Sequence, residues 1–246
     1  MKWQRTWRWI LGGLVLANLL LLLFIRQGPR GQTHVWIFPG GHGLLMMAPT
    51  TAVLLVDSGS DPLQSRYLIG QSLPFWKRTL DLAILTETDP EKVIAQAAVL
   101  RTYPAREGWY PLSVSSQAAL EVWERHVREV RSTAVGLRWQ TDGVQARLLA
   151  DSPVLLDVQV GLFRLIYTPA PTPSIPYATV WVVHSLPRDV KAPLPPLVIT
   201  RTLWTPGEEA IPRRLLGSPH TRFLLNPDRG IHLITDGQHY RWEPWP

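Results

Sequence analysis

Residues 73–92 read LPFWKRTLDLAILTETDPEK and pass from an apolar run to an acidic one. Residues 80–86 are largely apolar, which is typical of a strand that is buried on both faces. The segment that follows carries an acidic side chain at every second position, namely Glu87, Asp89 and Glu91. Pro90 suits the first position of a helix. The stretch therefore predicts a buried strand, an acidic loop and a helix over residues 91–103.

The segments around this stretch continue the alternation of strands and helices. Apolar runs predict strands over residues 34–38, 44–48 and 52–56, the first two joined by the turn Pro39-Gly40-Gly41-His42-Gly43. Residues 62–72 suit a helix with Asp61 as its N-cap, and residues 116–131 carry apolar side chains at helical spacing. Such alternation is typical of a layered α/β domain.

From Gly136 onward the chain changes to closely spaced strands. Short apolar runs separated by turn residues predict strands over residues 137–140, 144–149, 154–160, 163–167, 179–184 and 197–201. A helix over residues 208–216 precedes two closing strands, over residues 221–225 and 231–235. The length fits one α/β (α+β) domain over residues 34–246.

One apolar run near the N-terminus is long enough to cross a membrane. Residues 9–25 carry no charged side chain, and this length is at the short end of what spans the hydrocarbon core. We expect a transmembrane anchor there, after a basic tail at residues 1–8 and before a linker at residues 26–33. A cleaved signal peptide is the alternative, but no small-x-small cleavage site follows the run.

Basic residues on the two sides of this run predict its orientation. Lys2, Arg5 and Arg8 precede the run, and Arg26 and Arg30 follow it. Because cytoplasmic flanks carry the excess of Lys and Arg, we expect a single-pass cell-membrane protein with a cytoplasmic N-terminus and an external domain.

The net charge of +6 is mostly a property of the anchor region. Five of the 25 Lys and Arg lie in residues 1–33, where there is no Asp or Glu, so the rest carries 20 basic and 19 acidic side chains. A domain with that balance has no bulk attraction for a phosphate backbone, which argues against a nucleic-acid partner. The chain has no cysteine, which excludes a disulfide framework.

Residues 73–86 resemble the segment that leads into the metal-binding loop of the metallo-β-lactamase fold, in the form found at the C-terminus of ComEC-type competence proteins. Residues 53–59, VLLVDSG, resemble that family's strand and Asp-Gly-Gly turn. Residues 139–149 and 226–237 resemble later strands, so that the likeness covers residues 34–240. The resemblance implies an αββα sandwich with a metal site at one edge, which relatives use for hydrolysis.

The metal-binding motifs of that family are lost here. Its Thr-His-x-Asp/His-x-Asp-His loop reads Thr-Glu-Thr-Asp-Pro-Glu-Lys at residues 86–92, in which Lys92 replaces a histidine with a cation. The strand that should end in a bridging Asp reads FRLIYTPA at residues 163–170, and Thr205-Pro206 stands where a His-Pro ligand belongs. The family's His-His-Gly strand end keeps one histidine, His184. The resemblance therefore implies a degenerate site without a cofactor.

The remaining site positions allow two interpretations each. Glu87, Asp89 and Glu91 form either an oxygen-rich Mg²⁺ or Ca²⁺ site or, as we favour, the capped and acidic start of a helix. His184 is either a metal ligand or a hydrogen-bonded strand end. Asp57 is expected to bond local amides at its turn. Trp242 and Trp245 form either a contact surface or a tail packed on its own domain.

The favoured function is a non-catalytic, membrane-anchored interaction or scaffold module at the cell envelope, with an unknown protein partner and a link to DNA uptake. The first alternative is a metal-dependent hydrolase, phosphodiesterase-like or nuclease-like, with a one-metal site of Glu87, Asp89, Glu91 and His184. The second is a single-stranded DNA-binding accessory of a competence channel. In the favoured case we expect no catalytic residue. Asp57 and Lys92 are then vestiges of the lost metal site, together with Glu87, Asp89, Glu91 and His184.

Overall fold

The structure is a computed structural model, and the residues that it describes are 12–16, 18–19, 31–39, 42–59, 61–141, 143–170, 172, 175–185, 194–202, 222–225 and 229–245. The basic tail, most of the predicted anchor and most of the linker lie outside these residues, as does the predicted helix over residues 208–216. In the described part of the chain, no helix has the length and apolar character needed to cross a membrane.

The first sheet contains strands from both ends of the chain. Its order is β15-β14-β1-β2-β3-β4-β5-β6. The strands from β15 to β3 pair antiparallel, and those from β3 to β6 pair parallel. The bounds are β1 Thr33–Ile37, β2 Leu44–Met47, β3 Val53–Val56, β4 Leu80–Ile84, β5 Ala105–Tyr110, β6 Val127–Ser132, β14 Gly230–Thr235 and β15 Tyr240–Trp245.

The second sheet is formed by the later strands, in the order β13-β12-β11-β10-β9-β8-β7. The pairs from β7 to β10 are antiparallel and those from β10 to β13 are parallel. The bounds are β7 Arg138–Thr141, β8 Val144–Asp151, β9 Val154–Val160, β10 Phe163–Thr168, β11 Val180–Ser185, β12 Leu197–Thr202 and β13 Arg222–Leu225.

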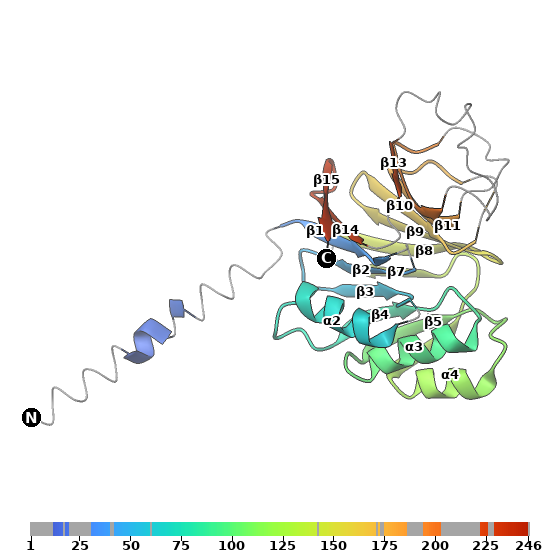
Figure 1. Ribbon diagram of the computed structural model, residues 1–246, viewed down its shortest axis with the longest axis horizontal. Helices are drawn as coiled ribbons and strands as arrows, with labels where there is room; N and C mark the ends of the chain where they lie inside the picture. The colour runs from blue at the N-terminus through green and yellow to red at the C-terminus, as the bar shows by residue number, and fades with distance from the viewer. Residues whose placement is uncertain are drawn as a thin grey trace, which may run out of the picture.

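Helices cover the outer face of the first sheet, as Figure 1 shows, and the second sheet covers its other face. They are α2 Pro62–Ser72, α3 Pro90–Leu100 and α4 Gln117–Glu124. One core lies between the two sheets, and a second lies between the first sheet and the helices. This helix–sheet–sheet order confirms three layers of the predicted αββα sandwich, and the helix predicted over residues 208–216 falls outside the described residues. No described core residue precedes Val35.

Strand β5 was not predicted, because its sequence AREGWY contains two charged residues and a glycine. The glycine is required by packing rather than by a turn. A Cβ at Gly108 would lie 2.4 Å from the ring of Trp123, which is fully buried against this strand. The indole N–H of Trp123 donates to the side-chain carbonyl of Gln96 at 2.7 Å, so the glycine lets α4 approach β5 closely.

The helix predicted over residues 116–131 is wrong beyond Glu124. The chain turns at Arg125 and continues as β6, whose last five residues are exposed. Val127 and Val130 fit a helical spacing by chance, and the ladder with β5 decides the structure instead. The charges of β6 suit an edge strand, since they discourage pairing with another chain.

The C-terminal tail packs on its own domain. Residues 240–245 form the edge strand β15 beside β14, and Trp245 is buried with its ring stacked on Phe38 at a centroid distance of 5.9 Å. Trp242 stays 38% exposed. The packing interpretation is therefore confirmed for Trp245.

Candidate functional site

The two sheets bring the carboxyl ends of parallel strands to one edge of the sandwich. Asp57 follows β3, Glu87 follows β4, and Tyr167 and His184 lie near the ends of β10 and β11. The turn that carries His42 lies at the same edge, because β1 runs in the same direction as β3. Ligand sites in α/β sheets are commonly found at such carboxyl ends. We call this side of the molecule the site edge.

Asp57 links the two sheets through its buried carboxylate. It accepts hydrogen bonds from the backbone N–H of Thr86 at 2.8 Å, from the Thr86 hydroxyl, and from the Tyr167 hydroxyl at 2.9 Å. The expectation of local amide partners is wrong, because Thr86 and Tyr167 are distant from Asp57 in the sequence. The backbone of Asp57 adopts a left-handed φ of 47°. The network fixes the start of the Glu87 loop.

The surroundings of Asp57 change its acidity. Burial disfavours its charged form, and the nearby negative charge of Glu87 adds to this effect, so that the pKa of Asp57 rises to about 6. The hydrogen bonds from Thr86 and Tyr167 oppose the shift without cancelling it. Burial likewise raises the pKa of the Tyr167 hydroxyl well above its usual value, so Tyr167 stays a donor at neutral pH.

The turn that carries His42 is held against the turn after β3. The N–H of Gly59 donates to the His42 carbonyl at 3.0 Å, and the N–H of Phe38 donates to the Gly43 carbonyl at 2.9 Å. A Cβ at Gly43 would lie 2.8 Å from the Val56 carbonyl oxygen. Only glycine permits this backbone approach, which fixes the position of His42.

His42, Glu87 and His184 converge at the site edge. One ligand atom from each side chain lies within 4.8 Å of the others, and no second group of this kind occurs in the described ranges. The rings of His42 and His184 meet edge to face with centroids 4.6 Å apart, and the His184 Nδ1 lies 3.7 Å from a Glu87 carboxylate oxygen. Two imidazoles and one carboxylate are a common ligand set for zinc.

Lys92 contacts the other oxygen of Glu87. Its ammonium forms an ion pair there, with 27% of the lysine side chain and 16% of the glutamate side chain exposed. A cation at this position neutralises Glu87 and would repel a metal ion bound by the same carboxylate. Lys92 therefore belongs to the site as a competing charge and not as a ligand.

Asp89 and Glu91 do not join this cluster. Asp89 is the N-cap of α3 and accepts from the Glu91 N–H at 3.0 Å, while Pro90 and Glu91 occupy the first turn. This confirms the favoured capping interpretation, and an acidic site of Glu87, Asp89 and Glu91 is not formed. His42 was missed as a candidate, since its turn is far from residues 86–92 in sequence. A histidine after a strand at the predicted metal edge was the available signal.

A cleft adjoins Glu87. It has a volume of about 350 Å³ and is open to solvent. Its wall includes Glu87, Asp89 and Asp151, and none of the residues that line it is a lysine or an arginine. The cleft therefore presents negative charge beside the cluster.

No family model matches the chain, and the comparison with curated proteins finds no match either. Solved structures do match, 58 chains in all. They include metallo-β-lactamases. The one from Cronobacter sakazakii with a HARLDQ motif is 16% identical, with a TM-score of 0.39, over 55% of this chain and 60% of that chain.

Two further matches are not lactamases by name. Zn(2+)-bound PqqB from Methylobacterium extorquens is 14% identical, with a TM-score of 0.47, over 68% of this chain and 70% of that chain. A diphosphatase from the PhnP family is 9% identical, with a TM-score of 0.43, over 69% of this chain and 85% of that chain.

The donor set fits one metal ion and not a pair. His42, Glu87 and His184 offer three converging ligand atoms. A second ion needs further carboxylates or imidazoles, but Asp89 is engaged as a cap and Lys92 is a cation. Asp57 is enclosed by its three hydrogen bonds. The described side chains therefore suit a single-metal centre.

Proposed function

We propose that this chain is a membrane-tethered hydrolase with a single-metal centre formed by His42, Glu87 and His184. The convergence of these three ligand atoms beside an open cleft carries the proposal. These three side chains would hold a zinc ion, and the ion would lower the pKa of a water molecule bound to it. This ligand set replaces the acidic set predicted from the sequence and keeps only Glu87 and His184 of it.

The residues of the chain position the centre. The Tyr167–Asp57–Thr86 network holds the loop that presents Glu87, and the close approach of Gly43 to β3 holds the turn that presents His42. His184 is carried by β11, a central strand of the second sheet. Because each ligand comes from a different element, the centre depends on the packing of the two sheets.

The charge of the cleft bears on the substrate class. Glu87, Asp89 and Asp151 line it. Lys92 pairs with Glu87, so the charges that the cleft presents to a substrate are those of Asp89 and Asp151. An anionic phosphodiester would be repelled there, so we favour an uncharged or positively charged ester or amide over a nucleic acid. The same charge argues against the single-stranded DNA-binding alternative.

We further propose the context of the domain. The motifs at residues 53–59 and 73–92 support a degenerate metallo-β-lactamase fold of the ComEC type, and the apolar run at residues 9–25 supports a membrane tether with the domain on the external side. A protein partner at the envelope, linked to DNA uptake, is the accompanying hypothesis. It rests on the resemblance.

The second candidate function is the non-catalytic interaction module. The ion pair between Lys92 and Glu87 favours it, because an internal cation already satisfies the carboxylate that the metal would need. In that case the retained Asp57 network stabilises the edge of the sandwich without serving catalysis. The two candidates differ in whether the chain binds a metal and uses it to cleave a substrate.

Metal analysis of the purified full chain tests the proposal. After exchange with zinc or manganese and removal of excess ion, we expect one bound metal per chain and metal-dependent cleavage of an ester or amide reporter. Metal without cleavage would support the module over the hydrolase. No metal, even in the Lys92 variant described next, would overturn the single-metal centre.

Replacing Lys92 by methionine is expected to raise metal affinity by at least about tenfold, because the substitution removes a like charge near the ion. Lys77→Met is the matched control, since Lys77 is also paired with a carboxylate, that of Asp81, but lies at the opposite edge of the sheet. Competition with a fluorescent chelator measures the metal affinity of both variants. If the two variants bind the metal equally tightly, Lys92 does not act on the site.

A further inference from the structure

The side of the first sheet that lies opposite the site edge is the side where most of its strands begin. Strands β1, β3, β4, β5 and β6 all run in one direction, so their first residues lie at this edge together. The β14–β15 turn lies there too, because Thr235 pairs with Thr33. Figure 1 shows β1 starting at this side of the sandwich. We call it the linker edge, since the predicted linker leads into it.

The two edges carry opposite charge. The connections at the linker edge hold one acidic residue, Asp236, and four basic ones, which are Lys77, Arg78, Arg101 and Arg125. The described connections at the site edge hold four acidic residues and no Lys or Arg, and the acids are Asp57, Asp61, Glu87 and Asp89. The near-neutral domain is therefore polarised along its strands.

The loop before β4 adds exposed aromatic surface to the basic edge. Phe75 is 56% exposed, and its ring meets that of Trp76 edge to face at 5.0 Å. Arg78 is exposed beside it, whereas Lys77 points away and pairs with Asp81 at 2.8 Å. Aromatic rings next to basic side chains are typical of segments that lie at a membrane–water interface.

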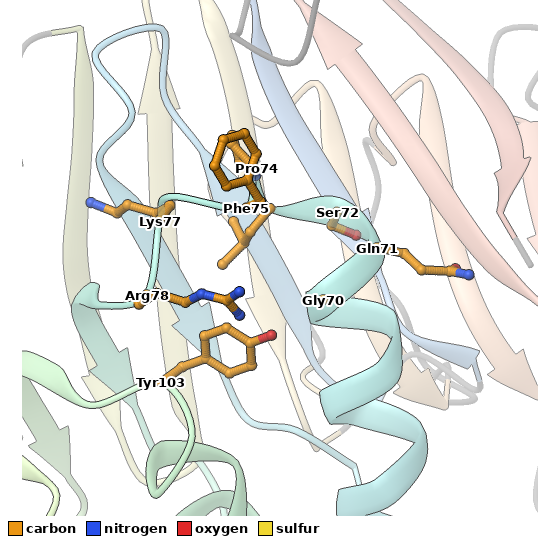
Figure 2. A pocket seen from close by; sticks show the side chains of 9 residues that line it. Gly70, Gln71, Ser72, Pro74, Phe75, Lys77, Arg78 and Tyr103 are labelled. Atoms are coloured by element: carbon orange, nitrogen blue, oxygen red, sulfur yellow. The ribbon is translucent and has the colours of Figure 1, made fainter. Parts of the chain in front are cut away.

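A shallow cavity of about 340 Å³ lies within this edge. Figure 2 shows the side chains of Arg78 and Tyr103 pointing into the space between the loop and Gly70 of α2. A Cβ at Gly70 would lie 3.2 Å from the Tyr103 hydroxyl, so the glycine keeps this space open. A guanidinium beside a hydroxyl suits a lipid phosphate.

The length of the linker limits how far this edge can lie from the membrane. Residues 26–32 separate Ile25, the end of the predicted anchor, from Thr33, the start of β1. Even when this segment is fully extended, the distance from Ile25 to Thr33 is at most roughly 28 Å. The linker edge is therefore the part of the first sheet that the tether holds nearest to the lipid.

We propose that the linker edge docks on an anionic lipid surface through Phe75, Arg78, Arg101 and Arg125. Phe75 enters the interface, and the three arginines face the lipid phosphates. The acidic site edge then points away from the membrane, so the candidate centre and its cleft stay open to solvent. The inference rests on the tether of the proposed function, but not on the metal centre.

The absence of cysteine permits a direct test on the full chain. Phe75→Cys and the matched control Leu112→Cys, which replaces a 75% exposed residue at the site edge, each receive one environment-sensitive fluorophore. Both proteins are reconstituted in phosphatidylcholine vesicles with and without phosphatidylglycerol. We expect a blue shift and protection from acrylamide at position 75 only, stronger with the anionic lipid. Arg78→Glu should weaken the docked state by about fivefold for each unit charge lost.

The outcomes separate the docking from the tether. Extraction of membranes with alkaline carbonate tests the tether alone, because it releases proteins that lack a membrane anchor. If the chain is released but added anionic vesicles still protect position 75 from acrylamide, docking occurs without an anchor. Equal quenching at positions 75 and 112 in anionic vesicles would overturn the docking. Protection of position 75 in the absence of lipid would also overturn it, in favour of a contact between proteins.

Discussion

Replacing His42 by alanine is expected to lower the metal affinity of the chain by well over 100-fold, because losing a ligand costs more than the roughly 10–100-fold caused by losing a residue that only supports a ligand. His42 supplies one of the three converging ligand atoms, and its turn is held in place by the backbone of residues 56–59. The zinc dissociation constant, measured by chelator competition at neutral pH, gives the result.

The matched control for His42→Ala is Glu91→Gln. Glu91 is acidic, exposed and on the loop that the sequence marked as a metal site, but it lies in the first turn of α3 outside the cluster. We expect the metal affinity of Glu91→Gln to equal that of the unchanged chain. His42→Gln, which keeps more of the side chain's volume, controls for a loss of packing against His184. Unchanged affinity in both His42 variants would contradict the ligand set.

The sequence predicted the parts of the site that lie within one continuous segment. The acidic loop after β4, its Asp89 cap and the helix from Pro90 follow from residue types at fixed spacing. Asp57 and His184 were marked through motifs at strand ends. These features depend on neighbours in the chain, and local chemistry is enough to predict them.

The partners of these residues could not be predicted in the same way. His42 reaches the cluster only because Gly43 packs on β3, and Tyr167 reaches Asp57 across 110 positions of sequence. Strand β5 was missed for a related reason, since a charged, glycine-containing segment becomes a strand only when β4 lies on one side and Trp123 fills the space above Gly108. Such contacts are set by the arrangement of layers, which local patterns do not contain.

A histidine chain on the outer face of the first sheet sets the background for pH effects. His232 contacts Glu243 at 2.8 Å and His34 at 3.0 Å. Burial lowers the pKa of both histidines, that of His34 to about 4. The unfolded protein binds these protons near pH 6.5, whereas the folded protein binds them only at lower pH. The two histidines therefore make the free energy of unfolding fall as the pH falls from about 6.5 to about 4.

The titration of Asp57 changes the stability of the fold in the opposite direction to that of the histidines. We expect Asp57→Asn to remove this contribution. The pKa of Asp57 is raised from 3.8 to about 6, so the folded state holds a proton that the unfolded state has lost between these values. The Asp57 contribution to the free energy of unfolding therefore declines as the pH rises from about 4 to about 6, by up to about 3 kcal/mol. Asparagine tolerates the left-handed backbone and does not titrate.

The test compares urea unfolding of residues 31–246, which contain all the described core, with and without Asp57→Asn at several pH values between 4 and 7. The variant should gain stability relative to the unchanged domain as the pH rises through this window, and its own stability should fall toward low pH, as the histidines require. Asp57→Ala, which removes the acceptor of the Thr86 and Tyr167 bonds, should instead lose stability throughout. Parallel curves for Asp57→Asn and the unchanged domain would mean that Asp57 keeps an ordinary acidity, and that neither burial nor the charge of Glu87 acts on it as the structure indicates.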